Sequence, residues 1–362
     1  MANKNTSPKI TWDFGTAYEL FVSLHVLDEA EYFGIRPSYA AGVRSRIPAA
    51  ERKLLEEVYS ITGVPLKWLS TLPAPKDAIS ALWALKQIPP IERVIKLFQL
   101  DEPQPEKYQK FNDILLRIVD ERKWNTEDAE YFLKHFQQKH GKIKLDAIEK
   151  FLDWVRKPEE LGEGILSAMQ AYYQAFFEEE EKRIEPILRA GLDRAIGLES
   201  QLSFEELFLE LSQGIQLSDE FRATKFVIAP AFWITPLIFF ERLDKDTMLL
   251  LFGTRPADMS VIPGETVPDA LVRSLKALAD PTRLKILFYL TKESLTPSEI
   301  ARKLQLRPPT VTHHLKELRL ASLVEFSIED ENNRYTVRRQ ALDAVYKQLN
   351  SFLENEPEKE IA

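Results

Sequence analysis

Residues 277–287 read ALADPTRLKIL, and this stretch decides the fold of the C-terminal part of the chain. It predicts a helix over 270–279, an Asp280 cap, and a second helix that begins at Pro281, where a missing amide hydrogen costs nothing. Residues 296–299 read TPSE, a complete capping box that opens a third helix. Three closely spaced helix starts predict a compact helical module.

A fourth helix follows, with the sequence TVTHHLKEL at 310–318. Counting 100° per residue from Val311 places Leu315 and Leu318 on the same face, which we expect to be buried. Short hydrogen-bonding side chains lie opposite, as a helix that reads base edges in the major groove requires. The base-contact candidates are Thr310, Thr312, His313 and Lys316.

Two short strands at 323–328 and 334–337 predict a wing, with its turn at Asn332 and Asn333 because Asn tolerates positive φ. We expect the acidic tip at 329–331 to stay out of the groove. Arginines beside the fourth helix and on the wing suit contacts to phosphate. The phosphate candidates are Arg307, Arg319, Arg334, Arg338 and Arg339.

The closing helix, 341–353, carries an apolar stripe that is too rich for a lone exposed helix. Pairing with a second subunit would bury this stripe together with the first helix of the module. The sequence therefore predicts a homodimer. The candidate dimer residues are Leu271, Leu275, Leu342, Val345, Leu349 and Phe352.

Residues 279–287 and 310–318 resemble the opening signature and the recognition helix of the ArsR family of winged-helix transcriptional regulators. The resemblance covers the last quarter of the chain. It implies a dimer that binds a palindromic site in double-stranded DNA, more often as a repressor. Residues 10–14 and 17–30 look like the large uncharacterised N-terminal domain of some long family members.

The chain departs from the family at three places. Arg307 stands where the family usually has a Ser cap, so we expect a weaker cap there. The third helix has no cysteine, and the last helix has Asp343 but no histidine. The family's metal sites are therefore not carried over, and we expect no metal and no cofactor.

Patterning along the chain predicts a mainly α protein with a little β structure (α+β). We expect an α-rich N-terminal domain over 1–253, a linker over 254–267, a winged helix-turn-helix over 268–353 and an acidic tail over 354–362. The predicted N-terminal helices are 77–87, 92–100, 128–140 (after a capping box at Thr126 that Ala129 leaves incomplete), 145–155, 165–177 and 185–195. The predicted strands are 10–14, 226–229, 235–242 and 248–253, which we expect to form a small antiparallel sheet with a hairpin turn at 244–246.

Charge and composition limit the functions that the chain can have. The net charge is −8, but residues 268–350 hold 14 basic and 10 acidic residues, which suits a DNA-facing module on an acidic domain. The chain has no cysteine, which excludes disulfides, thiolate metal sites and cysteine nucleophiles. The longest apolar run, 226–240, is too short to span a bilayer, and the polar start shows no secretory signal. We expect a cytoplasmic protein.

The N-terminal domain leaves several functions open. Its six tryptophans fit an ordinary core or a pocket for a small apolar ligand. We weigh a ligand- or partner-responsive domain against a scaffold that serves only dimerisation and interaction. An enzyme is the third alternative, but no phosphate-binding loop, dinucleotide fingerprint or nucleophile elbow occurs, and His135 and His140 lack the i, i+4 spacing of a helical metal pair. We assign no catalytic residues.

Overall fold

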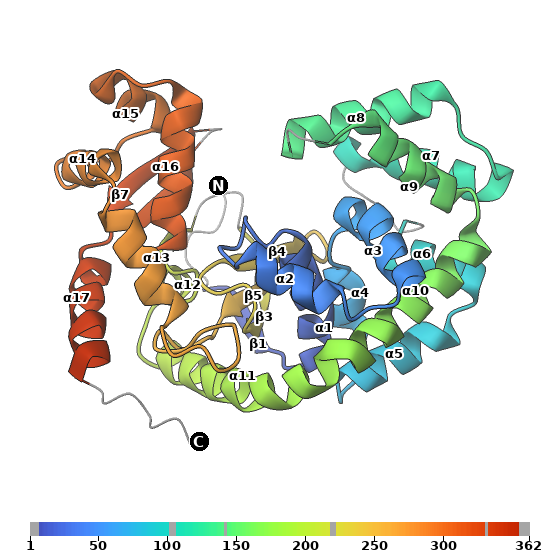
Figure 1. Cartoon of the computed structure of the whole chain (residues 1–362), viewed down its shortest axis with the longest axis horizontal. Helices are drawn as coiled ribbons and strands as arrows, with labels where there is room; N and C mark the ends of the chain where they lie inside the picture. The colour runs from blue at the N-terminus through green and yellow to red at the C-terminus, as the bar shows by residue number, and fades with distance from the viewer. Residues whose placement is uncertain (1–6, 101–105, 141–142, 218–221, 330–331, 355–362) are drawn as a thin grey trace. The chain divides into compact units, whose positions relative to one another are not determined.

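The structure is a computed structural model and describes residues 7–100, 106–140, 143–217, 222–329 and 332–354. The chain divides into two compact units. The winged-helix unit consists of Met1–Phe14, Glu31–Ile35 and Ile184–Ala362, and the helical unit of Gly15–Ala30 and Arg36–Arg183. The chain is mainly helical with two small sheets, as the sequence predicts (Figure 1). Among the described residues, no helix has the length and apolarity that a membrane span needs.

The helical unit is built from amphipathic helices. Its core contains aromatic side chains such as Tyr18, Phe132 and Tyr172, each fully buried. The helices are α1 (Thr16–Asp28), α2 (Pro37–Arg44), α3 (Ala49–Thr62), α4 (Leu66–Thr71), α5 (Ala78–Gln87), α6 (Pro90–Phe98), α7 (Glu106–Glu121), α8 (Thr126–His140), α9 (Leu145–Val155) and α10 (Pro158–Tyr172).

The N-terminal cap of α8 lies one residue earlier than the sequence predicts. The capping box is formed by Asn125 and Asp128 rather than by Thr126. The Asp128 amide donates to Asn125 Oδ1 (3.0 Å), and the Asn125 amide donates to Asp128 Oδ2 (2.9 Å). Asn and Asp reproduce the reciprocal arrangement of Ser and Glu, so the box is complete.

The predicted helices at 165–177 and 185–195 belong to one continuous helical stretch. After α10 come a π-helical turn, η1 (Tyr173–Phe177), and α11 (Glu178–Glu199), which crosses the boundary between the units. The charged run between the predicted helices continues the helix. It holds an exposed ion pair of Glu178 with Lys182 (3.4 Å) and a pair of the buried Glu180 with Arg183 (2.6 Å).

A four-stranded sheet in the winged-helix unit has the order β1-β3-β5-β4. Its strands are β1 (Lys9–Trp12), β3 (Lys225–Ala231), β4 (Ile238–Arg242) and β5 (Thr247–Gly253). The prediction of an antiparallel sheet is wrong. Strand β3 is parallel to both β1 and β5, and only β4 and β5 run antiparallel. The hairpin turn at 244–246 is confirmed, with Asp244 Oδ1 accepting from the Asp246 and Thr247 amides.

The C-terminal winged helix has the predicted order of elements (Figure 1). It comprises α13 (Asp269–Leu278), α14 (Pro281–Leu290), α15 (Pro297–Leu304), α16 (Pro308–Leu320), β6 (Val324–Glu329), β7 (Asn332–Val337) and α17 (Arg339–Glu354). The Asp280 cap and the capping box at Thr296 and Glu299 are both present. The wing differs in register: Asn332 pairs with Glu329 and Asn333 with Ile328, so both asparagines lie in β7. Residues 330–331 of the expected acidic tip are outside the described residues, as are residues 355–362 of the tail.

Arg283 explains why the stretch at 277–287 decides the local fold. Its amide donates to the Asp280 cap (2.9 Å), and its guanidinium donates to the carbonyls of Ala277 (2.9 Å) and Lys276 (2.6 Å) at the end of α13. One side chain therefore satisfies carbonyls that a helix end leaves without partners. The turn between α13 and α14 is fixed from both sides.

Elements before the module join its sheet and its core. Strand β2 (Ile215–Gln216), which follows α12 (Phe204–Leu211), pairs in parallel with β6, opposite Phe326 and Ser327. A single hydrophobic cluster contains Phe208 and Phe226 as well as Ile286 and Leu315. Residues 254–267, the expected linker, lie inside the winged-helix unit. That residues 254–267 separate an N-terminal domain from the winged helix stays a prediction.

Candidate nucleic-acid interface

Helix α16 begins without a side-chain cap. Arg307 occupies the N-cap position with extended backbone (φ −77°, ψ 140°), and Pro308 and Pro309 form the first turn. The Arg307 side chain makes no cap hydrogen bond, and the two prolines have no amide hydrogen that would need one. The first turn of α16 therefore offers an acceptor on DNA no free amide hydrogen at 308–311, because Thr310 and Val311 already donate to the Arg307 carbonyl (3.0 and 3.3 Å), and this helix must bind DNA through its side chains.

The two faces of α16 have the predicted character. Val311, Leu315 and Leu318 are at most 1% exposed and join the hydrophobic cluster of the unit. Of the four base-contact candidates, Thr310, Thr312 and His313 are exposed. The hydroxyl of the exposed Thr312 donates to the carbonyl of Pro308 one turn earlier (3.1 Å), and its oxygen keeps its capacity to accept hydrogen bonds.

Lys316 is half-buried, and its surroundings were not expected. Its Nζ lies 4.4 Å from the centre of the Tyr32 ring, in a cation–π arrangement. Tyr32 lies between α1 and α2 and belongs to the winged-helix unit. The sequence held no signal for this contact, because the two residues are far apart along the chain and no pattern connects them.

His314, next to the exposed His313, packs inward. Its side chain is 14% exposed, and Nδ1 lies 4.0 Å from a carboxylate oxygen of Asp280. Burial lowers the pKa of His314, and the nearby Asp280 carboxylate only partly opposes this. The hydrogen bond from the Arg283 amide lowers the pKa of Asp280. A neutral, buried imidazole at pH 7 favours packing over contact with phosphate.

The five phosphate candidates fall into two groups. Arg307 and Arg339, at the N-terminal ends of α16 and α17, are exposed. The other three are engaged within the protein. Arg319 lies over the Phe326 ring (4.2 Å), Arg334 donates to the carbonyl of Ser294 (2.6 Å), and Arg338 pairs with Glu210 (3.5 Å). Arg334 also lies 3.6 Å from Glu299 of the α15 capping box, so it fastens the wing to α15.

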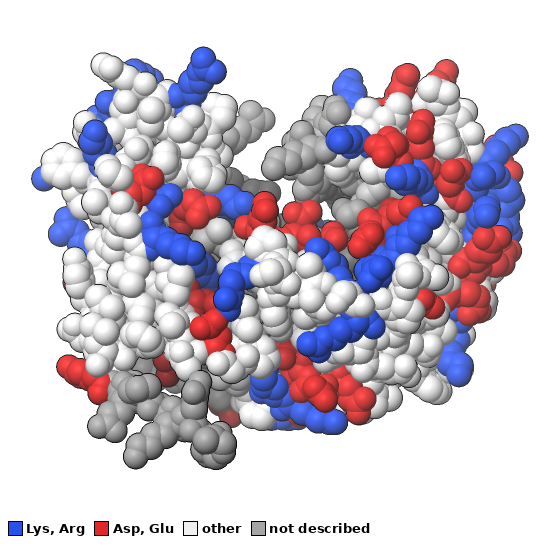
Figure 2. Space-filling model, viewed as in Figure 1, with Lys and Arg blue, Asp and Glu red and all other residues white. Residues whose placement is uncertain are grey.

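The surface charge is uneven over the winged helix. In the view of Figure 2, Lys and Arg side chains gather over its outer end, around α15 and the beginning of α16, where few Asp and Glu side chains are seen. This is the end that carries Arg307 and the exposed threonines of α16. A positive border around the reading helix is the electrostatic arrangement that attracts a phosphate backbone.

The candidate dimer residues are partly buried within the single chain. Leu271 and Val345 are 1% and 6% exposed, and Leu342 packs against the core. Leu275 is 39% exposed, and Leu349 and Phe352 are half-buried. Two further side chains of α17 that the candidate set missed, Tyr346 and Leu353, are 66% and 70% exposed. Helices α13 and α17 pack on each other and leave an apolar outer surface.

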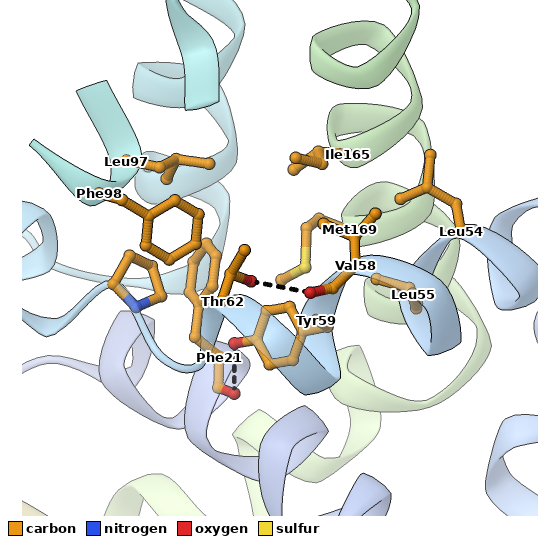
Figure 3. A pocket seen from close by; sticks show the side chains of 11 residues that line it. Phe21, Leu54, Leu55, Val58, Tyr59, Thr62, Leu97, Phe98, Ile165 and Met169 are labelled. Carbon is orange, nitrogen blue, oxygen red and sulfur yellow. Dashed lines mark hydrogen bonds between the residues drawn. The ribbon is translucent and has the colours of Figure 1, made fainter. Parts of the chain in front are cut away.

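One apolar cavity of the helical unit is small. It lies between α1, α3, α6 and α10, and Figure 3 shows Phe21, Tyr59 and Met169 around it. Its volume of about 10 Å³ is about that of one water molecule. The Tyr59 hydroxyl donates to the carbonyl of Phe21 (2.8 Å), away from the cavity.

Comparisons with known proteins match the C-terminal module. The family model described as bacterial regulatory protein, arsR family, matches residues 280–325. An uncharacterised HTH-type transcriptional regulator of Methanocaldococcus jannaschii is 39% identical over 64 residues, which is 18% of this chain and 67% of the relative. The arsenical resistance operon repressor of Staphylococcus xylosus is 32% identical over 75 residues, or 21% of this chain and 72% of the relative.

Two solved structures are also similar to the chain. The crystal structure of NolR from Sinorhizobium fredii has 30% identity and a TM-score of 0.20, and the match covers 24% of this chain and 83% of NolR. The crystal structure of an ArsR family transcriptional regulator has 22% identity and a TM-score of 0.22, over 27% of this chain and all of that chain.

Proposed function

The chain belongs to the ArsR family of bacterial regulatory proteins, and from that membership we propose that it is a cytoplasmic, sequence-specific repressor of transcription rather than an enzyme. The observation that carries the proposal is the division of α16 into two faces. Val311, Leu315 and Leu318 anchor the helix in the core, and Thr310 and His313 are exposed. A helix held in this way can present donors and acceptors to base edges in the major groove.

The partner is double-stranded DNA with a palindromic site, read by a homodimer. Two copies that meet through α13 and α17 would place two α16 helices on one side of the duplex. Half-sites read by such a dimer lie about one helical turn apart, on the order of 34–36 Å. The exposed Leu275, Tyr346 and Leu353 support this pairing, because contact with a second copy would bury them.

The test is selection of binding sites from genomic DNA by the purified protein. The variant combines Thr310→Ala and His313→Ala, which removes two exposed side chains and leaves the buried face of α16 intact. We expect wild type to enrich a palindromic site, and the double variant to bind that site at least tenfold more weakly, since a good base contact contributes roughly 1–3 kcal/mol.

A matched control replaces Thr126 and Lys134, two exposed side chains of α8, with alanine. This control should bind DNA as wild type does, and all three proteins should melt at the same temperature. Enrichment of no sequence by wild type, or equal affinity of the double variant for the site, would contradict the proposed function.

For the helical unit we propose control by a small apolar ligand, and the cavity in Figure 3 supports it. Its lining is apolar, and the flexible Met169 side chain is suited to rearrangement around a guest. The cavity must enlarge before it can hold more than a water molecule. The second candidate is a unit that serves only as a scaffold for dimerisation.

Trp68 offers a way to separate these candidates, because its ring packs edge-to-face on Phe21 (6.0 Å), which lines the cavity. An apolar probe such as toluene that enters the cavity should change the Trp68 emission and raise the melting temperature. The Trp68→Phe variant should lose the change in emission and keep the rise in melting temperature. A scaffold would show neither effect.

A further inference from the structure

The segment between α1 and α2 is shared between the two units. Residues Glu31–Ile35 group with the winged-helix unit, and the residues on both sides of them, up to Ala30 and from Arg36, belong to the helical unit. A change in the ends of α1 and α2 therefore acts on this segment through the covalent chain. We call residues 31–35 the α1–α2 loop.

The α1–α2 loop is fastened to the winged-helix unit next to Tyr32. Phe33 is 4% exposed, and its ring contacts Phe239 of β4 (5.9 Å between ring centres). Its carbonyl accepts a hydrogen bond from Arg273 of α13 (3.3 Å). Gly34 has φ +70°, and a Cβ there would lie 3.2 Å from Arg273 Cδ, so glycine permits the close approach. The loop has a fixed place on the unit.

This anchoring puts the Tyr32 ring over Lys316. The ring contacts Phe33 edge-to-face (5.1 Å) and is 45% exposed, and the Lys316 Nζ lies 4.4 Å from its centre. Lys316 follows Thr312 by four residues and therefore shares its face of α16. Among the four base-contact candidates, Lys316 alone is half-buried.

DNA cannot take up Lys316 while Tyr32 covers it. The major groove is about 12 Å wide, and a helix with its side chains is about 10–12 Å across, so the groove leaves no room for an aromatic side chain on the reading face. The Lys316 ammonium must also leave the ring to reach a base edge or a phosphate. Tyr32 and the duplex therefore compete for the same side chain.

We propose that the α1–α2 loop is an autoinhibitory element: Tyr32 holds Lys316 in a state that does not bind DNA, and a change in the helical unit withdraws the loop. The inference rests on the proposed function and names the regulation of that same site. If only the molecules with the loop withdrawn bind DNA, the apparent affinity equals the intrinsic affinity multiplied by the fraction of such molecules. Because a partly exposed cation–π contact of this kind is weak, its loss should raise the affinity for DNA only about two- to fivefold.

The test compares DNA affinities of Tyr32→Ala, Tyr32→Phe and wild type. The probe is a duplex selected from a random 20-base-pair library by the Tyr32→Ala protein, so the choice of site does not depend on the loop. We expect Tyr32→Ala to bind about two- to fivefold more tightly than wild type. Tyr32→Phe keeps the ring and should bind as wild type does.

Tyr131→Ala is the matched control. It removes a similar contact, with Lys110 Nζ 4.7 Å from the Tyr131 ring, within the helical unit. This variant should bind the duplex with wild-type affinity. A Tyr32→Ala protein that binds no more tightly than wild type would overturn the autoinhibitory role. Failure of both proteins to bind any selected duplex would instead overturn the proposed function, and the inference with it.

A second measurement reads the contact without relying on affinity. Reductive ¹³C-methylation keeps the lysine charge, and the methyl signal of Lys316 should be displaced by the ring current of Tyr32. The signal, assigned by its loss in Lys316→Arg, should return to the position of an ordinary lysine in Tyr32→Ala and in wild type saturated with the duplex. A Lys316 signal that stays displaced in the DNA complex would show that Tyr32 and DNA do not compete, and would overturn the inference.

Discussion

Asp28, the last residue of α1, carries a carboxyl group in an unfavourable place. Its side chain is 21% exposed, and the nearest cation, Arg44, lies 3.9 Å away. Burial, and to a lesser extent the neighbouring Glu29, raise the pKa of Asp28 from its usual value near 3.8 to about 6, although Arg44 opposes both. The folded protein therefore holds this proton more tightly than the unfolded chain does. Stability should fall as pH rises from about 4 to 6 and should stay lower above that range.

We predict that Asp28→Asn raises the free energy of unfolding by roughly 1–3 kcal/mol at pH 7.5, because it removes a poorly solvated charge. The gain should shrink towards zero at pH 4, where the wild-type carboxyl is protonated in the folded state. Urea denaturation at the two pH values measures this. Asp146→Asn, which removes an exposed carboxylate paired with Lys150, is the control and should change little. An equal gain at both pH values would rule out the titration of Asp28 as the cause.

At the residue scale, the sequence predicted what each side chain of α16 does within its own helix. The buried Val311 and the exposed His313 follow from helical periodicity alone. The environment of Lys316 could not be predicted in this way, because Tyr32 reaches it through a loop that is remote in the sequence. Arg334, expected at phosphate, is also held within the protein by a carbonyl at 294.

At the scale of elements, local signals placed helix ends well and strand partners poorly. Asp280 and Thr296 cap α14 and α15 through contacts that span only three residues, so the sequence reveals them. The direction of β3 depends on β1 and β5, and β1 lies about two hundred residues away in the chain. No short-range pattern carries that information, which explains the mistaken antiparallel sheet.

The cap of α8 gives a prediction with a control in the next residue. Asn125→Ala removes the side chain that accepts from the Asp128 amide and should lower stability by about 1 kcal/mol. Thr126→Ala, at the first helical position, should change stability by only a few tenths of a kcal/mol. Thermal denaturation of both variants measures the difference. A larger loss from Thr126→Ala would place the cap at 126, as the sequence had indicated.

At the scale of the whole molecule, the proposed dimer depends on the apolar surface on α13 and α17. Leu275, Tyr346 and Leu353 remain exposed after the chain has folded, although other parts of the same apolar stripes are buried. An exposed apolar surface on two packed helices is typical of a contact between subunits. Periodicity in the sequence predicted the stripes but could not say which of their residues the chain itself would bury.

We predict that Leu275→Glu combined with Leu353→Glu converts the dimer to a monomer and weakens binding to a palindromic duplex at least tenfold, because a single winged helix reads only one half-site. Sedimentation and duplex titration measure the two effects. The matched control is Ile79→Glu with Trp83→Glu, a second exposed apolar pair on α5 (61% and 65% exposed). A monomer produced by the control, with the α13–α17 variant still dimeric, would move the interface to α5.

Strand β2 has a practical consequence for anyone who wishes to study the DNA-binding part in isolation. A fragment that starts at the apparent linker would lack Ile215, and the backbone groups of β6 beside Phe326 would become a bare sheet edge. Such an edge is a template for cross-chain pairing, and the side of the core normally covered by Phe208 would face water. A fragment that begins before α12 keeps the third strand and its covering helix, and should stay in solution where the shorter one aggregates.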